Sequence, residues 1–296
     1  MTMRMVCKSF HCVAIAALAC GRASAGELPT LDAIQAAWKQ RTKAVSSSQL
    51  IWTEVHTRPK GEPVDPDDNT PLPEDLNTTF FKKMILSGDK FRIAGKGKAR
   101  HFQTKTLQPF EFTAVFNGVG RSLHDFPGRK RNLGYIVKSA KGLADISYRP
   151  AYLSLDPGNG NLGRIDLRNY RITPKLVTIN GRNCVLVERQ DQGGDNALYL
   201  DVERQFVIIR SVTLEGTHVY RQIDIAYDCD GNGVWYPKSW LLDTRKFGGG
   251  SSELRISGTT KNFKSPYAST DRDFELEFPP STHIYDLTNP KPGEIF

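Results

Sequence analysis

Two short strings in this chain have the spacing of loops that bind nucleotides or calcium. Gly158–Gly163 reads G-x-G-x-x-G, but Pro157 precedes it, and a dinucleotide site needs a strand before the glycines and a helix after them. Asp228–Gly233 begins like a calcium loop, but its twelfth position is Ser239, where a bidentate glutamate is required. Because Tyr236–Pro237 continues a strand pattern, we interpret Asp228–Gly233 as a tight hairpin turn.

Other residue types that perform chemistry are scattered along the chain. The histidines beyond the first 25 residues show no metal-ligand spacing, and no cysteine has a neighbouring histidine. A G-x-S-x-G nucleophile motif is absent, and no pair of carboxylates stands out for acid–base work. The sequence therefore predicts no catalytic residue, no metal and no cofactor. A hydrolase whose site is assembled from distant residues is the least favoured alternative.

The first 25 residues have the pattern of an export signal. Arg4 and Lys8 form a positive start, and Val13–Ala19 is an apolar run too short to span a bilayer. Ala23–Ala25 is a small-x-small cleavage site. We therefore expect Met1–Ala25 to be a signal peptide and the mature protein to be exported to the periplasm or cell envelope.

A second interpretation of this segment is lipid anchoring. Ala17–Cys20 loosely resembles a lipobox, in which Cys20 would be lipidated, although position −3 is alanine instead of leucine. Soluble export is the favoured alternative. No later segment has about 18 consecutive apolar residues, which a membrane-spanning helix would need.

The charge of the chain gives little support for nucleic acid as a partner. The full sequence has a formal net charge of +8, of which Arg4, Lys8 and Arg22 leave with the signal. The remaining excess is mild for this length, so we predict no nucleic-acid partner. Positive charge is densest between Arg121 and Arg149, which we interpret as a solvated loop. The alternative is a surface for anionic lipid headgroups or for a partner.

Two cysteines remain in the mature chain, Cys184 and Cys229. If the intervening strands pair in sequence, these cysteines lie three strand steps apart, or ~14 Å, against a Cα limit of ~7 Å for a disulfide. We therefore predict two free, buried thiols.

One amphipathic helix is predicted near the start of the mature chain. Thr30 is a plausible N-cap, and apolar residues recur on one face of Leu31–Val45. Such a helix needs a sheet to pack against, and Gln49–Thr57 is expected to be the first strand. Arg58–Asn77, which is rich in proline and acidic residues, predicts a mobile loop.

Alternating strands fill most of the remaining sequence. Between Tyr170 and Phe278, apolar residues recur at a spacing of two, with turn residues about every 8–12 positions. Asn180-Gly181 is the strongest hairpin signal, because both turn positions need positive φ. The last strand is expected near 273–278. Gly134–Leu155 breaks the alternation and predicts one or two short helices packed on the sheet.

These elements predict a mainly β (α+β) fold. Its core is one large curved antiparallel sheet, a half-barrel, with the N-terminal helix and the short helices packed on its concave face. No break in composition and no internal repeat divides the chain, so residues 26–296 are expected to form a single domain.

Several strings resemble the LolA-like outer-membrane lipoprotein-sorting proteins. Leu198–Arg210 resembles that superfamily's strand, Asp-x-Glu turn, and strand ending in arginine, and Gly181–Glu188 lies where the preceding strand is expected. Gly233–Lys238 and Phe274–Pro279 resemble strings of exported families distantly similar to those carriers. The resemblance covers about Leu31–Asp286 and implies an incomplete barrel with an apolar cavity between sheet and helices.

Such a cavity suits acyl chains. The candidate ligand-binding residues are Trp52, Phe91, Phe112, Phe116, Ile223, Ile225 and Trp240. The alternative is that these side chains simply fill the core. Trp38 and Trp235 are expected to pack the helix against the sheet.

The functional expectation is a non-enzymatic envelope protein that binds a lipid, an acyl chain, a lipoprotein or another apolar ligand. Association with an envelope membrane is compatible with it. The alternative is an interaction or stress-sensor module whose core is packed and holds no ligand.

Overall fold

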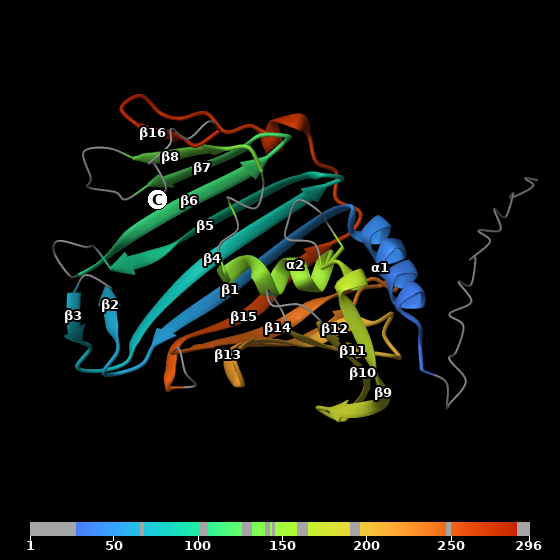
Figure 1. Cartoon of the computed structure of the whole chain (residues 1–296). Coiled ribbons are helices and arrows are strands. Elements are labelled where there is room, and N and C mark those ends of the chain that lie inside the picture. Colours follow the sequence, from blue (N-terminus) through green and yellow to red (C-terminus); the bar gives the residue numbers. More distant parts are fainter. Residues whose placement is uncertain are drawn as a thin grey trace, which may run out of the picture.

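One large sheet of 14 strands organises the molecule, which we describe from a computed structural model (Figure 1). The structure describes residues 28–65, 68–100, 106–125, 132–139, 143, 146–158, 165–189, 196–246 and 250–288. In chain order the strands of the sheet are β1 (Ser47–Arg58), β4 (Leu76–Ser87), β5 (Lys90–Arg100), β6 (Leu107–Phe116), β7 (Gly120–Asp125), β8 (Leu133–Val137), β9 (Tyr170–Ile179), β10 (Arg182–Arg189), β11 (Ala197–Asp201), β12 (Val207–Glu215), β13 (His218–Cys229), β14 (Trp235–Arg245), β15 (Ser252–Lys264) and β16 (His283–Asp286).

The sheet consists of two meanders joined at its centre. From β1, strands β4 to β8 follow one another towards one edge, and from β15, strands β14 to β9 follow in reverse order towards the other. β1 and β15 pair with each other, so the first and thirteenth strands of the sheet form the seam between the meanders. Only the pair formed by β16 and β8, at the edge, is parallel among these described strands. The predicted mainly β fold with one large curved antiparallel sheet is confirmed.

The predicted N-terminal helix is α1 (Leu31–Val45). The Thr30 hydroxyl accepts a hydrogen bond from the Ala33 N–H at 3.1 Å, as expected for an N-cap. The buried side of α1 carries Ile34, Trp38, Arg41 and Val45. The Trp38 indole N–H donates to the carbonyl of Phe206 at 2.8 Å, which fixes α1 to the turn between β11 and β12.

A short helical segment crosses the concave face of the sheet. It consists of the 3-10 turn η2 (Ile146–Tyr148) and helix α2 (Arg149–Leu155), which begins with Pro150 in its first turn. Almost all of α2 is buried, and it contacts β12, β13 and β14. Figure 1 shows α2 across the face of the sheet and α1 beside it at one end. A further 3-10 turn, η3 (Leu167–Asn169), packs against α1 and β9.

Large aromatic side chains of the sheet itself fill much of the concave core. Trp240 on β14 lies directly over Gly258 of the neighbouring strand β15, and Phe112 lies over Gly95 in the same way. In both places a Cβ atom on the glycine would overlap the aromatic ring. These glycines therefore provide the space that lets rings from adjacent strands lie flat on the sheet.

The convex face carries a second, smaller core under the C-terminal segment. Ile85 and Val115 of the sheet pack there against Phe274, which belongs to the 3-10 turn η4 (Asp271–Phe274). The Asn117 side-chain amide donates to the Phe274 carbonyl at 3.0 Å. The C-terminal segment thus crosses the convex face before it forms β16 at the sheet edge.

Two predictions of local structure are wrong, and a third is confirmed in part. Arg58–Asn77 contains the hairpin of β2 (Pro63–Asp65) and β3 (Asp68–Pro71), so part of the expected loop is ordered by backbone pairing. In Gly134–Leu155 the expected short helices are present as η2 and α2 on the sheet, but the segment begins with strand β8, which pairs with the edge of β7. The strand expected at 273–278 is replaced by η4 and an extended segment, and pairing resumes at β16.

The cysteine prediction is partly confirmed. Cys184 and Cys229 are both free, and Cys184 is buried, but Cys229 is exposed at the end of β13. Burial raises the pKa of Cys184 to about 11, which keeps this thiol protonated and unreactive at neutral pH.

Both predicted hairpin turns are present. Asn180 and Gly181 have φ values of 51° and 73°, as the turn between β9 and β10 requires. In Asp228–Gly233, the Asp230 carboxylate accepts hydrogen bonds from the backbone N–H groups of Asn232 and Val234 at 2.9 and 2.8 Å. That carboxylate stabilises the turn between β13 and β14. The absence of calcium binding stays a prediction.

Some predictions concern residues that the structure does not describe. The export signal, Cys20 and the basic centre at 129–131 lie there, and the single domain over residues 26–296 stays a prediction. Among the described helices, none combines the length and apolar character that a membrane crossing requires.

Gly258→Ala should test the close packing of aromatic rings on the sheet. The added methyl group would overlap the Trp240 indole, so the free energy of unfolding should fall by roughly 1–3 kcal/mol. Urea unfolding measures this loss. The control is Gly231→Ala, because no atom lies within 4 Å of the added Cβ there. Equal effects of the two substitutions would contradict this packing.

Candidate functional site

Two oppositely charged residues lie on the apolar concave face. Trp52, Glu54 and His56 alternate along β1, so they share a face, and Lys82 occupies the same face of the neighbouring strand β4. Lys82 is directly opposite Trp52 in the register, which brings it diagonally next to Glu54. The Glu54 side chain is fully buried and that of Lys82 is 2% exposed. Charged groups at this depth need partners.

Three donors surround the Glu54 carboxylate. Oε1 accepts the Trp52 indole N–H at 2.7 Å, and Oε2 lies 2.5 Å from Lys82 Nζ and 2.9 Å from His56 Nε2. Burial by itself raises the pKa of Glu54. The attraction of Lys82 and the hydrogen bonds from His56 and Lys82 outweigh burial, so the pKa is lowered below its ordinary value. Glu54 is therefore ionised at neutral pH.

The Lys82 ammonium links the sheet to the helical segment above it. Nζ donates to the hydroxyl of Ser147 in η2 at 2.8 Å. It also lies over the rings of Tyr148, Phe80 and Phe112, at 4.8, 5.7 and 5.8 Å from their centroids. These aromatic faces stabilise the cation electrostatically. The ion pair thus holds η2, and through it the start of α2, against β1 and β4.

A serine hydrogen-bonded to a lysine has the composition of a nucleophile and its general base. A lysine base must be neutral to accept the proton from serine. Here Nζ forms an ion pair with the ionised Glu54 at 2.5 Å, and this contact engages the amine in place of a role as base. The arrangement therefore suits anchoring of η2 better than activation of Ser147. Among the described residues, no cluster of histidine, cysteine, aspartate or glutamate could hold a metal ion.

A row of aromatic rings continues from this ion pair across the concave face. His56 packs against Phe80 at 4.7 Å between ring centroids, and Phe80 is followed by Phe110 at 6.4 Å. The row then reaches His124 at 6.0 Å and Tyr135 at 5.5 Å. It ends at Tyr285 of β16, 5.3 Å from Tyr135. Phe80 is buried, whereas the other members are half-buried, so the row forms a partly accessible apolar surface.

The seven predicted ligand-binding residues all lie in the main core that the concave face forms. Their exposed fractions range from 0% to 7%, and Trp52 packs edge-on against Trp240 at 5.9 Å. Phe91 stacks on Phe116, and Phe112 packs against Tyr148 of η2. The structure brings the seven residues into one cluster: Trp52, Phe91, Phe112, Phe116, Ile223, Ile225 and Trp240.

The sequence interpretation missed the charged pair and the aromatic row. A signal for the pair was present, because Glu54 falls between Trp52 and His56 at the spacing of the buried positions. Lys82 likewise falls between Phe80 and Met84. A charge at an apolar position of a strand indicates a buried partner. The row had no such signal, because it joins side chains from strands that are distant in sequence.

A second buried cation fixes α1 next to α2. Arg41 donates to the carbonyls of Ser154 and Trp235, the latter at 3.1 Å, and lies over the Tyr227 ring at 5.3 Å. Burial raises the pKa of Tyr227 to about 12, so the phenol stays neutral. Thr42 donates to Asp156 at 2.6 Å, next to the end of α2. This cluster holds the two helices together.

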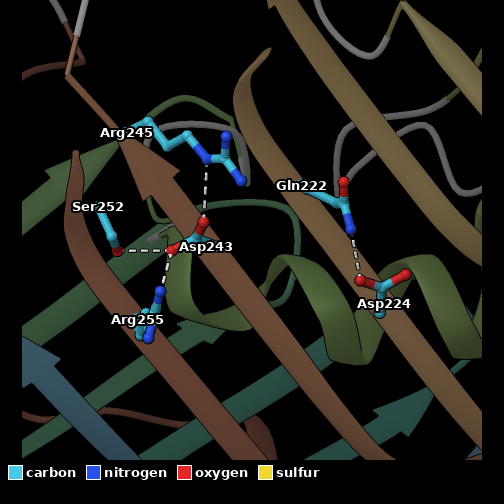
Figure 2. Close-up of polar contacts among 6 residues, drawn as sticks. All are labelled: Gln222, Asp224, Asp243, Arg245, Ser252 and Arg255. Atoms are coloured by element: carbon cyan, nitrogen blue, oxygen red, sulfur yellow. Dashed lines mark hydrogen bonds and ion pairs between the residues drawn. The ribbon is translucent and has the colours of Figure 1, made fainter. Parts of the chain in front are cut away.

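The convex face of β13–β15 carries an exposed polar network instead. Figure 2 shows Asp243 accepting hydrogen bonds from Arg245, Ser252 and Arg255, at 3.1, 2.5 and 3.3 Å. Asp224 accepts one from Gln222 at 2.6 Å (Figure 2). Such surface pairs contribute little stability individually. We interpret this network as solvated sheet surface.

Four pockets lie outside the cluster of seven residues. One, of about 350 Å³, lies between the sheet and η4, and another, of about 600 Å³, extends over β4, β5 and β6. Two smaller ones adjoin α1, with volumes of about 340 and 260 Å³. None of these four is lined by a predicted ligand-binding residue.

The comparisons with known proteins give similarity of fold alone. No family model matches the sequence, and no curated protein matches it. A DUF1329 family protein from Desulfovibrio piger is 10% identical, with 82% of this chain and 97% of that chain covered and a TM-score of 0.48. A LolA superfamily protein from Nitrosomonas europaea is 9% identical, with coverage of 82% and 97% and a TM-score of 0.41.

A third similar structure is that of MucB in complex with MucA(peri), which is 12% identical, with coverage of 80% and 100% and a TM-score of 0.20. These similarities concern the course of the chain and identify no ligand or activity.

Lys82→Met should reveal the cost of leaving the Glu54 carboxylate without its ammonium partner. We expect the free energy of unfolding to fall by about 3–5 kcal/mol at neutral pH, measured with urea. Lys83→Met is the matched control, since Lys83 points to the opposite face of the same strand. The double variant Glu54→Leu/Lys82→Met should recover much of the loss. A Lys82 effect no larger than the control would contradict a buried ion pair.

The contribution of Glu54 should also depend on pH. Its folded-state pKa is lowered, so its stabilisation is complete above the unfolded value of about 4.3 and is lost as the pH falls through the folded-state pKa. The stability difference between wild type and Glu54→Gln should therefore shrink when unfolding is measured at progressively lower pH. A stability difference between the two proteins that grows as the pH falls would contradict a lowered pKa of Glu54.

Proposed function

We propose that this protein is a non-enzymatic, exported binding protein that takes an apolar chain on the concave face of its sheet. The ligand class is an acyl chain, free or as part of a lipid or lipoprotein. The chain would lie along the aromatic row and reach the cluster of seven core residues once η2 and α2 move away. Export rests on the signal pattern of the first 25 residues.

The observation that carries this proposal is the unequal covering of the concave face. α2 contacts β12, β13 and β14, whereas the aromatic row runs over β1, β4, β6, β7 and β8. Half-buried Phe110, His124 and Tyr135 offer an apolar surface that continues into the buried cluster through Phe112. A continuous surface of this kind matches the shape of an acyl chain.

Binding without catalysis is supported by the chemistry of the buried charges. Glu54 and Lys82 neutralise each other and hold η2, and Arg41 is engaged by backbone carbonyls. These groups position helices over the sheet. Their role is therefore in the opening and closing of the face and not in bond cleavage.

The second candidate is an interaction module with a packed core. It is favoured by the low exposure of the seven core residues, which already fill the space between sheet and helices. The two candidates differ in one respect. A carrier needs η2 and α2 to move, whereas a packed module never exposes its concave core.

Binding of the neutral probe N-phenylnaphthylamine, and its displacement by fatty acids of increasing chain length, tests the carrier proposal. We expect saturable binding that Phe110→Ser weakens by about tenfold or more, because a phenyl group contributes roughly 1.5–3 kcal/mol of apolar burial. The control is Leu241→Ser, which removes an exposed apolar side chain from β14. Absence of saturable binding would favour the packed module.

Ser147→Ala distinguishes a moving cover from a fixed one. It removes the hydrogen bond from Lys82 to η2, which should lower stability by about 1 kcal/mol. If η2 and α2 must move to admit the ligand, the same change should strengthen apparent probe binding, because the open state becomes more populated. Weaker or unchanged binding, compared with wild type, would contradict the opening step.

A further inference from the structure

A basic pocket lies on the convex face, on the opposite side of the sheet from the concave core. Its volume is about 350 Å³, and it lies between the sheet and η4. Ile85 and Ala94 line it from β4 and β5. Lys83 and Arg92 come from the same two strands, and Arg272 and Asp273 come from η4. The pocket thus gathers three cations and one carboxylate.

The nearby carboxylates are already engaged elsewhere. The Asp273 side chain accepts hydrogen bonds from the Thr270 N–H at 2.8 Å and from the Thr270 hydroxyl at 3.2 Å, which completes a capping box. Asp271 forms an ion pair with Lys90 at 2.8 Å. Neither acid is bonded to Lys83 or Arg272 in the described part of the chain.

The three cations differ in how they are held. Arg92 donates through Nη1 to the carbonyls of Asp273 and Glu275, at 3.4 and 3.1 Å, so its guanidinium is fixed at the pocket wall. Lys83 is half-buried and lies over the Tyr267 ring at 6.0 Å. Arg272 is exposed. Three cations and one carboxylate thus line the pocket, and that carboxylate is bonded to Thr270.

We propose that this pocket binds a phosphate-class anion, either free or as the headgroup of an anionic lipid. Guanidinium and ammonium groups recognise phosphate oxygens through short, charge-assisted hydrogen bonds. The pocket offers both kinds of donor from two directions, the sheet and η4. The inference is independent of the proposed concave-face function, because the two faces share no lining residue among those named.

Titration calorimetry with inorganic phosphate and co-sedimentation with phosphatidylglycerol vesicles test this site, with phosphatidylcholine vesicles as the neutral reference. The test variant is Lys83→Gln/Arg272→Gln, which leaves Arg92 and its contacts to the C-terminal segment intact. The charge-matched control is Lys261→Gln/Lys264→Gln, which removes two exposed lysines of β15. Binding should fall at least about tenfold in the test variant and stay within about twofold of wild type in the control.

The two ligands separate the two sources of the anion. Saturable binding of inorganic phosphate that the test variant loses supports a site for a free anion. Binding to phosphatidylglycerol vesicles alone, lost in the same variant, supports a lipid headgroup. Equal losses in the test and control variants would show general attraction to positive charge and would overturn the proposal, as would no binding of either ligand.

Discussion

The burial of the Glu54 carboxylate is the constraint on which the centre of the structure depends. A charge without contact to water requires a counter-ion and hydrogen-bond donors, and each of them comes from a different place. Lys82 comes from the adjacent strand, Trp52 and His56 come from β1 itself, and Ser147 binds Lys82 from the helical segment above. A slip of one residue between β1 and β4 would turn Lys82 to the other face and leave Glu54 without its ammonium partner. The pair therefore fixes the register of the strands and the place of η2 together.

The concave face of this open sheet has to be shielded from water although few helices pack on it. α2 contacts β12, β13 and β14, so it covers only part of the concave face. The sheet supplies much of the cover itself, because Trp240 and Phe112 lie flat over glycines of neighbouring strands. Dense packing of this kind resists change, whereas the half-buried row beyond Phe80 is open to contact. The buried core and the half-buried row thus form one continuous apolar face. Such a face is expected both of a carrier and of a module with a packed core.

The sequence predicted the elements that depend on local patterns. The N-cap at Thr30, the helix Leu31–Val45 and the Asn180-Gly181 hairpin follow from neighbouring residues, and the structure confirms them. Strands β9 to β15 were also predictable, because each pairs with the next. The parallel pairing of β16 with β8 and the diagonal contact of Glu54 with Lys82 were not predicted. Both depend on which strands, distant in sequence, become neighbours in the sheet. No short sequence motif indicates this pairing.

The seam between β1 and β15 has a consequence for the order in which the chain folds. Gln49 pairs with Lys264, so the central pairing joins segments from opposite ends of the polypeptide. Each meander consists of neighbours in sequence and loses little chain entropy when it forms, whereas the seam closes a very long loop. During synthesis, β1 has to wait with one edge unpaired until β15 has emerged. Chaperone protection or rapid docking of α1 would be most valuable in that interval, when the unpaired edge is exposed to aggregation.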